Sequence, residues 1–189
     1  MVKWQITNIN VVAYFDTPIK IDKLAEKISQ EHITNYRPED FPGLVLYFDK
    51  FRVNIFRTGT MVITGIKKVE DLIPVINEIR KLLKKYGINL PTTYRLEIAT
   101  SSISGEFDYK NIDIERINYE LENTFYDPET FPAVIVRYNI APGYKISFNI
   151  FRNGYFVGAG FKSKPDTIIQ HIDQIVNEFQ EEVIKRFVK

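Results

Sequence analysis

The fold of this chain is decided by the stretch Asn54-Ile-Phe56-Arg-Thr-Gly59-Thr-Met-Val62-Ile-Thr64-Gly65-Ile-Lys67. The same pattern returns 95 residues later as Asn149-Ile-Phe151-Arg-Asn-Gly154-Tyr-Phe-Val157-Gly-Ala159-Gly160-Phe-Lys162, with eight of fourteen positions identical. Two apolar runs joined by a glycine-containing turn are typical of a β-hairpin. We therefore expect the chain to contain the same hairpin twice.

A second pair of matching segments precedes these hairpins. Tyr36-Arg-Pro-Glu-Asp-Phe41-Pro-Gly-Leu-Val45 corresponds to Tyr126-Asp-Pro-Glu-Thr-Phe131-Pro-Ala-Val-Ile135, with five of ten positions identical at an offset of 90. Self-similarity of this extent indicates an internal duplication, and two copies are too few for a solenoid. We therefore expect two repeats, residues 1–90 and 91–189, that form one pseudo-symmetric body. The change of offset from 90 to 95 predicts a five-residue insertion around 138–144, which contains an Ala-Pro-Gly turn.

Each repeat shows the same order of predicted elements, namely a strand, a short helix, a meander of strands and a long helix. In the first repeat we expect strands at 4–15, 43–48, 51–57 and 60–67, and helices at 21–30 and 69–86. In the second we expect a strand at 94–104 and helices at 112–121 and 165–187. Helices on one face of an antiparallel sheet define an α+β fold, and they leave the opposite face of the sheet open.

Side-chain parity predicts which residues lie on the open face. Side chains alternate between the two faces along a strand. If Val53 and Ile55 face the helices, Asn54 and Phe56 face outward. The other residues expected to face outward are Val62, Thr64, Asn149, Phe151, Val157 and Ala159.

Four phenylalanines stand in two matched pairs near the predicted ends of the sheet. Phe56 and Phe151 lie just before the hairpin turns, while Phe41 and Phe131 each precede a proline in a loop. A phenylalanine in a strand is usually part of the core. Two symmetric pairs at the ends of a sheet are better suited to act as apolar wedges.

Composition excludes several kinds of function. The chain has no cysteine, which excludes disulfides, cysteine zinc sites and thiol nucleophiles. Its two histidines, His32 and His171, lie in unrelated places, and no phosphate-binding loop or serine nucleophile motif is present. We expect no catalytic residues, no metal and no cofactor. No apolar run is long enough for a membrane span or a signal peptide, so we expect an intracellular protein.

The charges are divided unequally between the repeats. The net charge of +1 argues against a protein that holds nucleic acid mainly by its overall field. Residues 1–90 contain 14 Lys and Arg against 10 Asp and Glu, a net charge of +4, whereas residues 91–189 contain 11 against 14, a net charge of −3.

The repeated residues resemble a known family. The Phe-Pro-Gly-Leu-Val run from Phe41, the Ile-Phe-Arg-x-Gly hairpin and the Val-Ile-Thr-Gly-Ile-Lys strand are similar to the matching segments of the TATA-box-binding protein core, over essentially the whole chain. The resemblance implies a saddle of two repeats, with helices on the convex face of a curved antiparallel sheet. It also implies a transcription initiation factor that bends A·T-rich promoter DNA through the minor groove, since members of this family kink DNA with apolar wedges.

The resemblance further implies a role for individual residues. Phe41 with Phe56, and Phe131 with Phe151, would form two intercalating pairs. The implied minor-groove contacts are Asn8, Asn10, Pro42, Asn54, Val62, Thr64, Pro132, Asn149 and Val157. The implied phosphate contacts are Arg57, Lys67, Arg137, Arg152 and Lys162. In the acidic loop of the second repeat, Asp127 and Glu129 would bind the basic transcription factor B.

The sequence departs from the family pattern at the centre of the implied groove surface. The second-repeat counterpart of Thr64 is Ala159, and the counterpart of Asn8 is either Ile98 or Thr100, depending on the alignment. Conversely, Asn10, Asn54 and Asn149 stand where the family usually has aliphatic residues. An Asn amide can donate to the acceptors of A·T pairs or accept from the guanine amino group, so we predict permissive sequence selection.

The resemblance also implies partners and a cellular location. Besides double-stranded DNA and transcription factor B, it implies indirect contact with RNA polymerase and pairing of two DNA-free copies. The absence of an extension before the first repeat resembles archaeal members, so we expect the cytoplasm or nucleoid of an archaeal-type cell, or the nucleus in a eukaryote. The alternative interpretation is a paralogue that acts as a protein-protein adaptor in transcription, with relaxed or lost DNA specificity.

Overall fold

The computed structural model describes residues 1–189 and has an α+β fold, which confirms the predicted class. Ten strands form one antiparallel sheet in the order β2-β3-β4-β5-β1-β6-β10-β9-β8-β7. The strands are β1 (Lys3–Tyr14), β2 (Thr34–Asn35), β3 (Leu44–Tyr47), β4 (Arg52–Ile55), β5 (Thr60–Ile66), β6 (Arg95–Glu106), β7 (Thr124–Phe125), β8 (Ala133–Ala141), β9 (Tyr144–Phe151) and β10 (Tyr155–Ser163). The helices are α1 (Ile21–Ile28), α2 (Leu72–Lys85), α3 (Ile114–Glu120) and α4 (Ile168–Glu182).

The chain forms two compact units that divide it within strands β1 and β6. The first-repeat unit is Asn8–Ala99, and the second-repeat unit is Met1–Thr7 together with Thr100–Lys189. The first residues of the chain are fastened to α4 of the second-repeat unit. Trp4 Nε1 donates to Asp173 Oδ1 at 3.1 Å, and the Val2 N–H donates to Asn177 Oδ1 at 3.2 Å.

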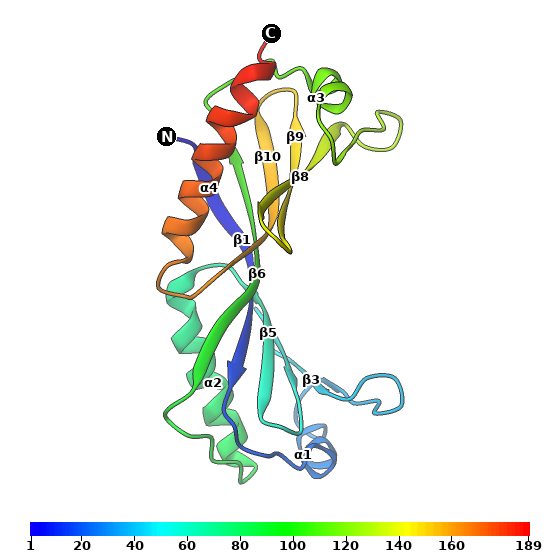
Figure 1. Ribbon diagram of the computed structural model, residues 1–189. Helices are drawn as coiled ribbons and strands as arrows, with labels where there is room; N and C mark the ends of the chain where they lie inside the picture. Colours follow the sequence, from blue (N-terminus) through cyan, green and yellow to red (C-terminus); the bar gives the residue numbers. More distant parts are fainter. The chain divides into compact units, whose positions relative to one another are not determined.

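Alternating burial along the strands confirms the predicted parity. Val53 and Ile55 of β4 are fully buried, whereas Asn54 is half-buried on the other face. In β9 the same alternation buries Phe148 and Ile150. One face of each unit's strands therefore belongs to the core, and Figure 1 shows the long helix of each unit, α2 or α4, on one side of its strands.

The helices form where apolar residues recur at helical spacing. Helix α2 buries Leu72, Ile76, Ile79 and Leu83 along one stripe, as the sequence predicts. Both long predicted helices are divided at one end. A 3₁₀ turn at Val69–Asp71 precedes α2, and a 3₁₀ turn at Ile184–Phe187 follows α4.

The two cores differ in their side chains. In the second-repeat unit, Phe148 stacks on Phe179 with ring centroids 4.2 Å apart, and Phe107 stacks on Phe156 at 4.3 Å. Aromatic pairs of this kind add to the stabilisation from apolar burial. The core of the first-repeat unit is built mainly from Ile, Leu and Val.

The five-residue insertion lengthens a hairpin. In the first repeat, β3 and β4 are each four residues long, whereas β8 has nine residues and β9 has eight. The paired register of β8 and β9 continues to Ala141 opposite Tyr144, so Pro142 and Gly143 form the turn. The predicted turn is present, and most of the inserted residues extend the two strands.

Candidate nucleic-acid interface

Two equivalent loops present Phe41 and Phe131. In the first repeat the Phe41 N–H donates to the Arg37 carbonyl oxygen at 2.9 Å. In the second repeat the Phe131 N–H donates to the Asp127 carbonyl oxygen, also at 2.9 Å. The same backbone turn therefore holds the same residue in both repeats, and a Pro follows it in each.

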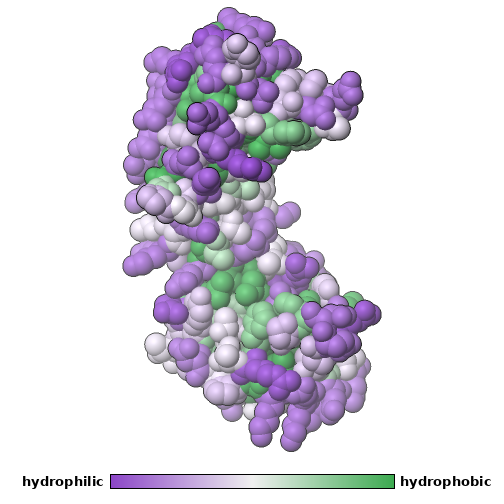
Figure 2. Space-filling view, turned by 45° about the vertical axis from the view of Figure 1, so that its right-hand side comes forward, coloured by the Kyte–Doolittle hydropathy of each residue, from purple (hydrophilic) through white to green (hydrophobic).

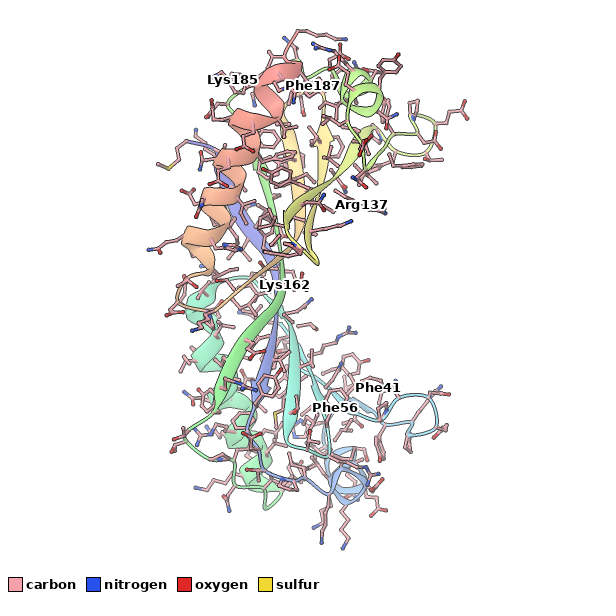
Figure 3. The ribbon with its side chains drawn as sticks, viewed as in Figure 1. Phe41, Phe56, Arg137, Lys162, Lys185 and Phe187 are labelled. Carbon is pink, nitrogen blue, oxygen red and sulfur yellow. The ribbon has the colours of Figure 1, made fainter.

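The four phenylalanines form two pairs with almost the same geometry. The ring centroids of Phe41 and Phe56 lie 5.6 Å apart with planes at 68°, and those of Phe131 and Phe151 lie 5.8 Å apart at 71°. Edge-to-face packing is a favourable arrangement for aromatic rings. None of the four is fully buried. Figure 3 shows Phe41 and Phe56 close together where the loop leaves the sheet.

The residue after Pro42 makes the two pairs slightly different. A Cβ atom on Gly43 would lie 2.7 Å from Phe41 Cε1 and 3.1 Å from Phe56 Cε1, so both rings cover the Gly43 backbone. The second repeat has Ala133 at this position, and there Phe131 is 37% exposed, whereas Phe41 is less exposed. A glycine therefore lets the first pair settle closer to the sheet.

Three rows of side chains cross the outer face of the first-repeat unit. We define the outer face as the half-exposed face opposite the core. The wedge row is Phe56, Thr60 and Tyr14; the amide row is Val45, Asn54, Val62 and Val12; and the cation row is Tyr47, Arg52 and Thr64. All the outward residues predicted in this repeat lie in these rows.

The second-repeat unit has the same three rows. The wedge row is Phe151 and Tyr155, with Ala133, which is only 1% exposed, paired with Phe151. The amide row is Ile135, Asn149 and Val157, and the cation row is Arg137, Ser147 and Ala159. Figure 2 shows apolar surface, in green, on both units among hydrophilic side chains in purple. Each outer face therefore offers an apolar strip with an amide at its centre.

Sequence reasoning missed Arg52 and Ser147 of the cation rows. Arg52 has the same parity as Asn54 and Phe56, and its Nε donates to Thr64 Oγ1 at 3.0 Å. Ser147 lies opposite both Arg137 and Ala159, so it supplies the hydroxyl that Ala159 lacks. Strand parity, extended by one step along β4 and β9, could have identified both.

The side chains of Asn8 and Asn10 are hydrogen-bonded to each other. Asn8 Oδ1 accepts the Gly65 N–H at 3.0 Å, and Asn8 Nδ2 donates to Asn10 Oδ1 at 3.0 Å. The Asn8 amide therefore orients Asn10, whose Nδ2 hydrogens stay free to donate.

The hydrogen bonds also resolve the counterpart of Asn8. The Phe15 N–H donates to the Gly59 carbonyl oxygen, and the Phe107 N–H donates to that of Gly154. When the two repeats are aligned with Phe15 on Phe107, Thr100 corresponds to Asn8. Thr100 is half-buried. Ile98, the other candidate, is only 3% exposed and belongs to the core.

Two of the five predicted phosphate contacts already have acidic partners. Arg57 pairs with Asp22 at 2.9 Å, and Arg152 pairs with Glu115. A hydrogen bond from the Tyr36 hydroxyl, with Arg57 nearby, holds the pKa of Asp22 below its ordinary value. Hydrogen bonds from Arg152 likewise lower the pKa of Glu115.

The other three predicted cations are exposed. Lys67 follows the last residue of β5, Lys162 lies in β10 and Arg137 lies in β8. Figure 3 shows the side chain of Arg137 projecting away from its strand. An exposed cation at the margin of an apolar face is suited to a phosphate group.

The two acidic residues of the second-repeat loop differ in their surroundings. Asp127 has a structural role, since its Oδ1 accepts the Glu129 N–H at 3.2 Å and its carbonyl oxygen holds Phe131. The Glu129 side chain is exposed at the tip of the loop. Glu129 is therefore the more accessible of the two for a basic partner.

The structure brings no set of three or more His, Asp or Glu side chains into a metal-binding cluster. His171 stacks on Tyr144 with ring centroids 5.9 Å apart, and the Tyr144 hydroxyl lies 3.1 Å from His171 Nε2. None of the four helices combines the length and the apolar character that a membrane span requires.

Comparison with known proteins identifies the family. The family model described as "Transcription factor TFIID (or TATA-binding protein, TBP)" matches residues 3–86 and matches again at residues 97–181. The chain belongs to the TATA-binding protein family. The double match also confirms the two repeats.

Archaeal TATA-box-binding proteins are among the relatives of this chain. It is 33% identical to the TATA-box-binding protein of Pyrobaculum neutrophilum over 94% of this chain and 87% of that protein. It is 31% identical to the protein of that name from Pyrodictium occultum, over 95% of this chain and 85% of the relative. The solved structure "Methanococcus jannaschii TBP" superimposes with a TM-score of 0.75 at 27% identity, covering 95% of this chain and 99% of that one.

Membership in the TATA-binding protein family settles the class of function. The family consists of DNA-binding transcription factors and not of enzymes, so the expectation of a non-enzymatic protein is confirmed. The resemblance drawn from the repeated segments is confirmed too. The roles of the individual residues stay predictions.

Proposed function

We propose that the protein is a transcription initiation factor that binds A·T-rich promoter DNA through the minor groove and bends it with its two phenylalanine pairs. The observation that carries this proposal is the contrast among the phenylalanines. Six of them, Phe107, Phe148, Phe156, Phe161, Phe179 and Phe187, are fully buried in the second-repeat unit. Phe41, Phe56, Phe131 and Phe151 instead remain accessible in two matching pairs.

The geometry of each pair suits insertion between base pairs. A flat apolar ring can enter an unstacked base step, at a cost of a few kcal/mol per step that the larger contact with bent DNA offsets. The amide rows lie beside the wedges and consist mainly of aliphatic side chains. They fit the floor of an A·T minor groove, where no guanine amino group projects. Val62 and Val157 are the aliphatic residues next to the amide in these rows.

Cations at the margins of the outer faces support the same proposal. Lys67, Arg137 and Lys162 are exposed and suited to phosphates, and we add Arg52, which projects from the outer face itself. Arg57 and Arg152 would reach phosphates only by leaving their acidic partners. We further propose that Glu129, with Asp127 shaping its loop, binds the basic transcription factor B.

The test is a measurement of binding and bending on one labelled duplex. A duplex of roughly 20 base pairs, about two helical turns, carries a TATA element and a dye at each end. Binding is read by anisotropy and bending by energy transfer. We expect the double variant Phe56→Ala, Phe151→Ala to lose the bend. The matched control is Tyr119→Ala, which removes an aromatic ring that is 90% exposed on α3, and it should bend DNA like the parent protein.

Two other results would contradict the proposal. If the double variant Phe56→Ala, Phe151→Ala still bends the duplex, the wedge mechanism is wrong. Absence of binding to any duplex, with or without transcription factor B, would favour the adaptor alternative.

A further inference from the structure

Asn54 and Asn149 occupy the same place in the two outer faces. Asn54 lies in the amide row between Val45 and Val62, its partners on β3 and β5. Asn149 lies between Ile135 and Val157, its partners on β8 and β10. Each row thus places one carboxamide between aliphatic side chains, two residues before the wedge phenylalanine in the sequence.

The Asn54 amide is incompletely satisfied in the free protein. Its Oδ1 is buried and has no hydrogen-bond partner. A half turn about the Cβ–Cγ bond would exchange the oxygen for the nitrogen and leave a donor unpaired instead. A buried polar atom without a partner costs free energy, so a rotation of the Asn54 side chain that brings both ends of its amide to the surface, where DNA can pair with them, would relieve that cost.

The other amides of the first-repeat face, Asn8 and Asn10, have hydrogen-bond partners within the protein. Asn8 uses its oxygen and one of its hydrogens within the protein, on Gly65 and Asn10. Asn54 makes no such contact, because its neighbours across the sheet are valines. Asn54 is therefore the amide of this face that most lacks a partner.

The base edges of the minor groove differ in what they offer such an amide. An A·T pair presents only acceptors, adenine N3 and thymine O2, whereas a G·C pair adds the guanine N2 amino donor. Against A·T, the amide can donate, but its oxygen faces other acceptors. Against guanine, the oxygen accepts from the N2 amino group while the nitrogen donates to the neighbouring N3, so both ends are satisfied.

We propose that Asn54 and Asn149 each read a G·C pair beside a wedged step, so that the preferred site is A·T-rich but carries guanine at two defined positions. This inference rests on the proposed minor-groove function and deepens it. The same amide at the same position of both repeats predicts two such positions, one for each repeat.

The test scans one base pair at a time. In an A·T-rich duplex with end labels, each pair is replaced in turn by G·C, and the dissociation constant is measured by anisotropy. We expect the substitution to tighten binding at two positions by about five-fold or more, the lower end of a bidentate base contact. Replacing that guanine by inosine, which lacks the N2 amino group, should abolish the gain.

Variants then assign each position to its residue. Asn54→Leu should remove the guanine preference at one position, and Asn149→Leu should remove it at the other. Leucine suits the aliphatic surroundings, and thermal unfolding verifies that each variant folds. The matched control is Asn77→Leu, an exposed asparagine of α2 outside the outer face, which should keep both preferences.

The outcomes separate this inference from the proposed function. Tight binding and bending by the parent protein with A·T preferred at every position would overturn the guanine proposal and leave the wedge mechanism standing. Equal binding of guanine and inosine duplexes would overturn it as well. If no duplex binds at all, both proposals fall.

Discussion

Arg57 and Asp22 form an ion pair at 2.9 Å that joins the turn after β4 to the first turn of α1. Arg152 and Glu115 form the equivalent pair in the second repeat, where Glu115 lies in the first turn of α3. Duplication has therefore preserved the pairing although the acid changed from aspartate to glutamate. Each pair holds the turn that follows a wedge phenylalanine.

Because Asp22 pairs with Arg57, removing the Asp22 charge should affect DNA binding through Arg57. Asp22→Asn frees the Arg57 guanidinium for a phosphate, so we expect tighter DNA binding at low salt. The plot of log affinity against log salt should steepen by about one unit, as for one added phosphate contact. The matched control is Glu26→Gln, which removes the same charge from an exposed position one turn along α1. Equal effects of both changes would show that only net charge matters.

Tyr155 predicts that the two wedges differ in strength. Its ring lies 5.6 Å from that of Phe151 at 50°, and it is 36% exposed, whereas the first repeat has Thr60 at this position. We expect Tyr155→Thr to weaken DNA binding by about 1 kcal/mol, typical of one aromatic contact, and Thr60→Tyr to strengthen it. Anisotropy titrations on the TATA duplex measure both. Unchanged affinity in the two variants would exclude a contribution from Tyr155.

Replacing Gly59 by alanine should cause a large loss of stability. It has a φ of +83°, and a Cβ atom there would lie 2.3 Å from the Thr17 carbonyl oxygen. Gly143 has a φ of +74° with no atom within 4 Å of the same position. Gly143→Ala should therefore lower the free energy of unfolding by roughly 1 kcal/mol, from backbone strain alone. Gly59→Ala should lower it by about 3 kcal/mol or more. Urea unfolding measures both, and equal losses would show that the contact with Thr17 relaxes.

Tyr138 predicts a decline in stability at alkaline pH. Its hydroxyl donates to Glu182 Oε2 at 2.9 Å. Burial, and to a smaller extent this hydrogen bond, raises the pKa of Tyr138 from 10.0 to about 12. Between these values the unfolded chain loses the proton while the folded protein keeps it, so the stabilisation is complete below pH 10 and declines as the pH rises toward 12.

The variant Tyr138→Phe removes this titration. Its free energy of unfolding should be lower at neutral pH, because the hydrogen bond is gone, and should fall less steeply above pH 10. Urea unfolding across the alkaline range measures the slope. Tyr119→Phe, at an exposed position, serves as the control. Parallel slopes for the parent and Tyr138→Phe would contradict the assignment.

Much of the candidate site could be predicted from local pattern. Strand alternation placed Asn54 and Phe56 on the outer face, and the structure confirms it, because parity is a property of a single strand. Arg52 was overlooked, although the same parity applies to it. The acidic partners of Arg57 and Arg152 could not be predicted, since they come from helices far away in the sequence.

The sequence by itself determined the duplication, the order of the strands and helices, the α+β class and the residues that face outward. These features depend on periodicities of two and of about 3.6 residues, which every segment carries locally. Only the tertiary structure decided which residues meet across strands and helices. It placed the Asn54 amide between Val45 and Val62, Thr64 beside Arg52, and Asp22 against Arg57. Such pairings depend on strand register and helix packing, which arise only when distant segments bury their apolar faces together.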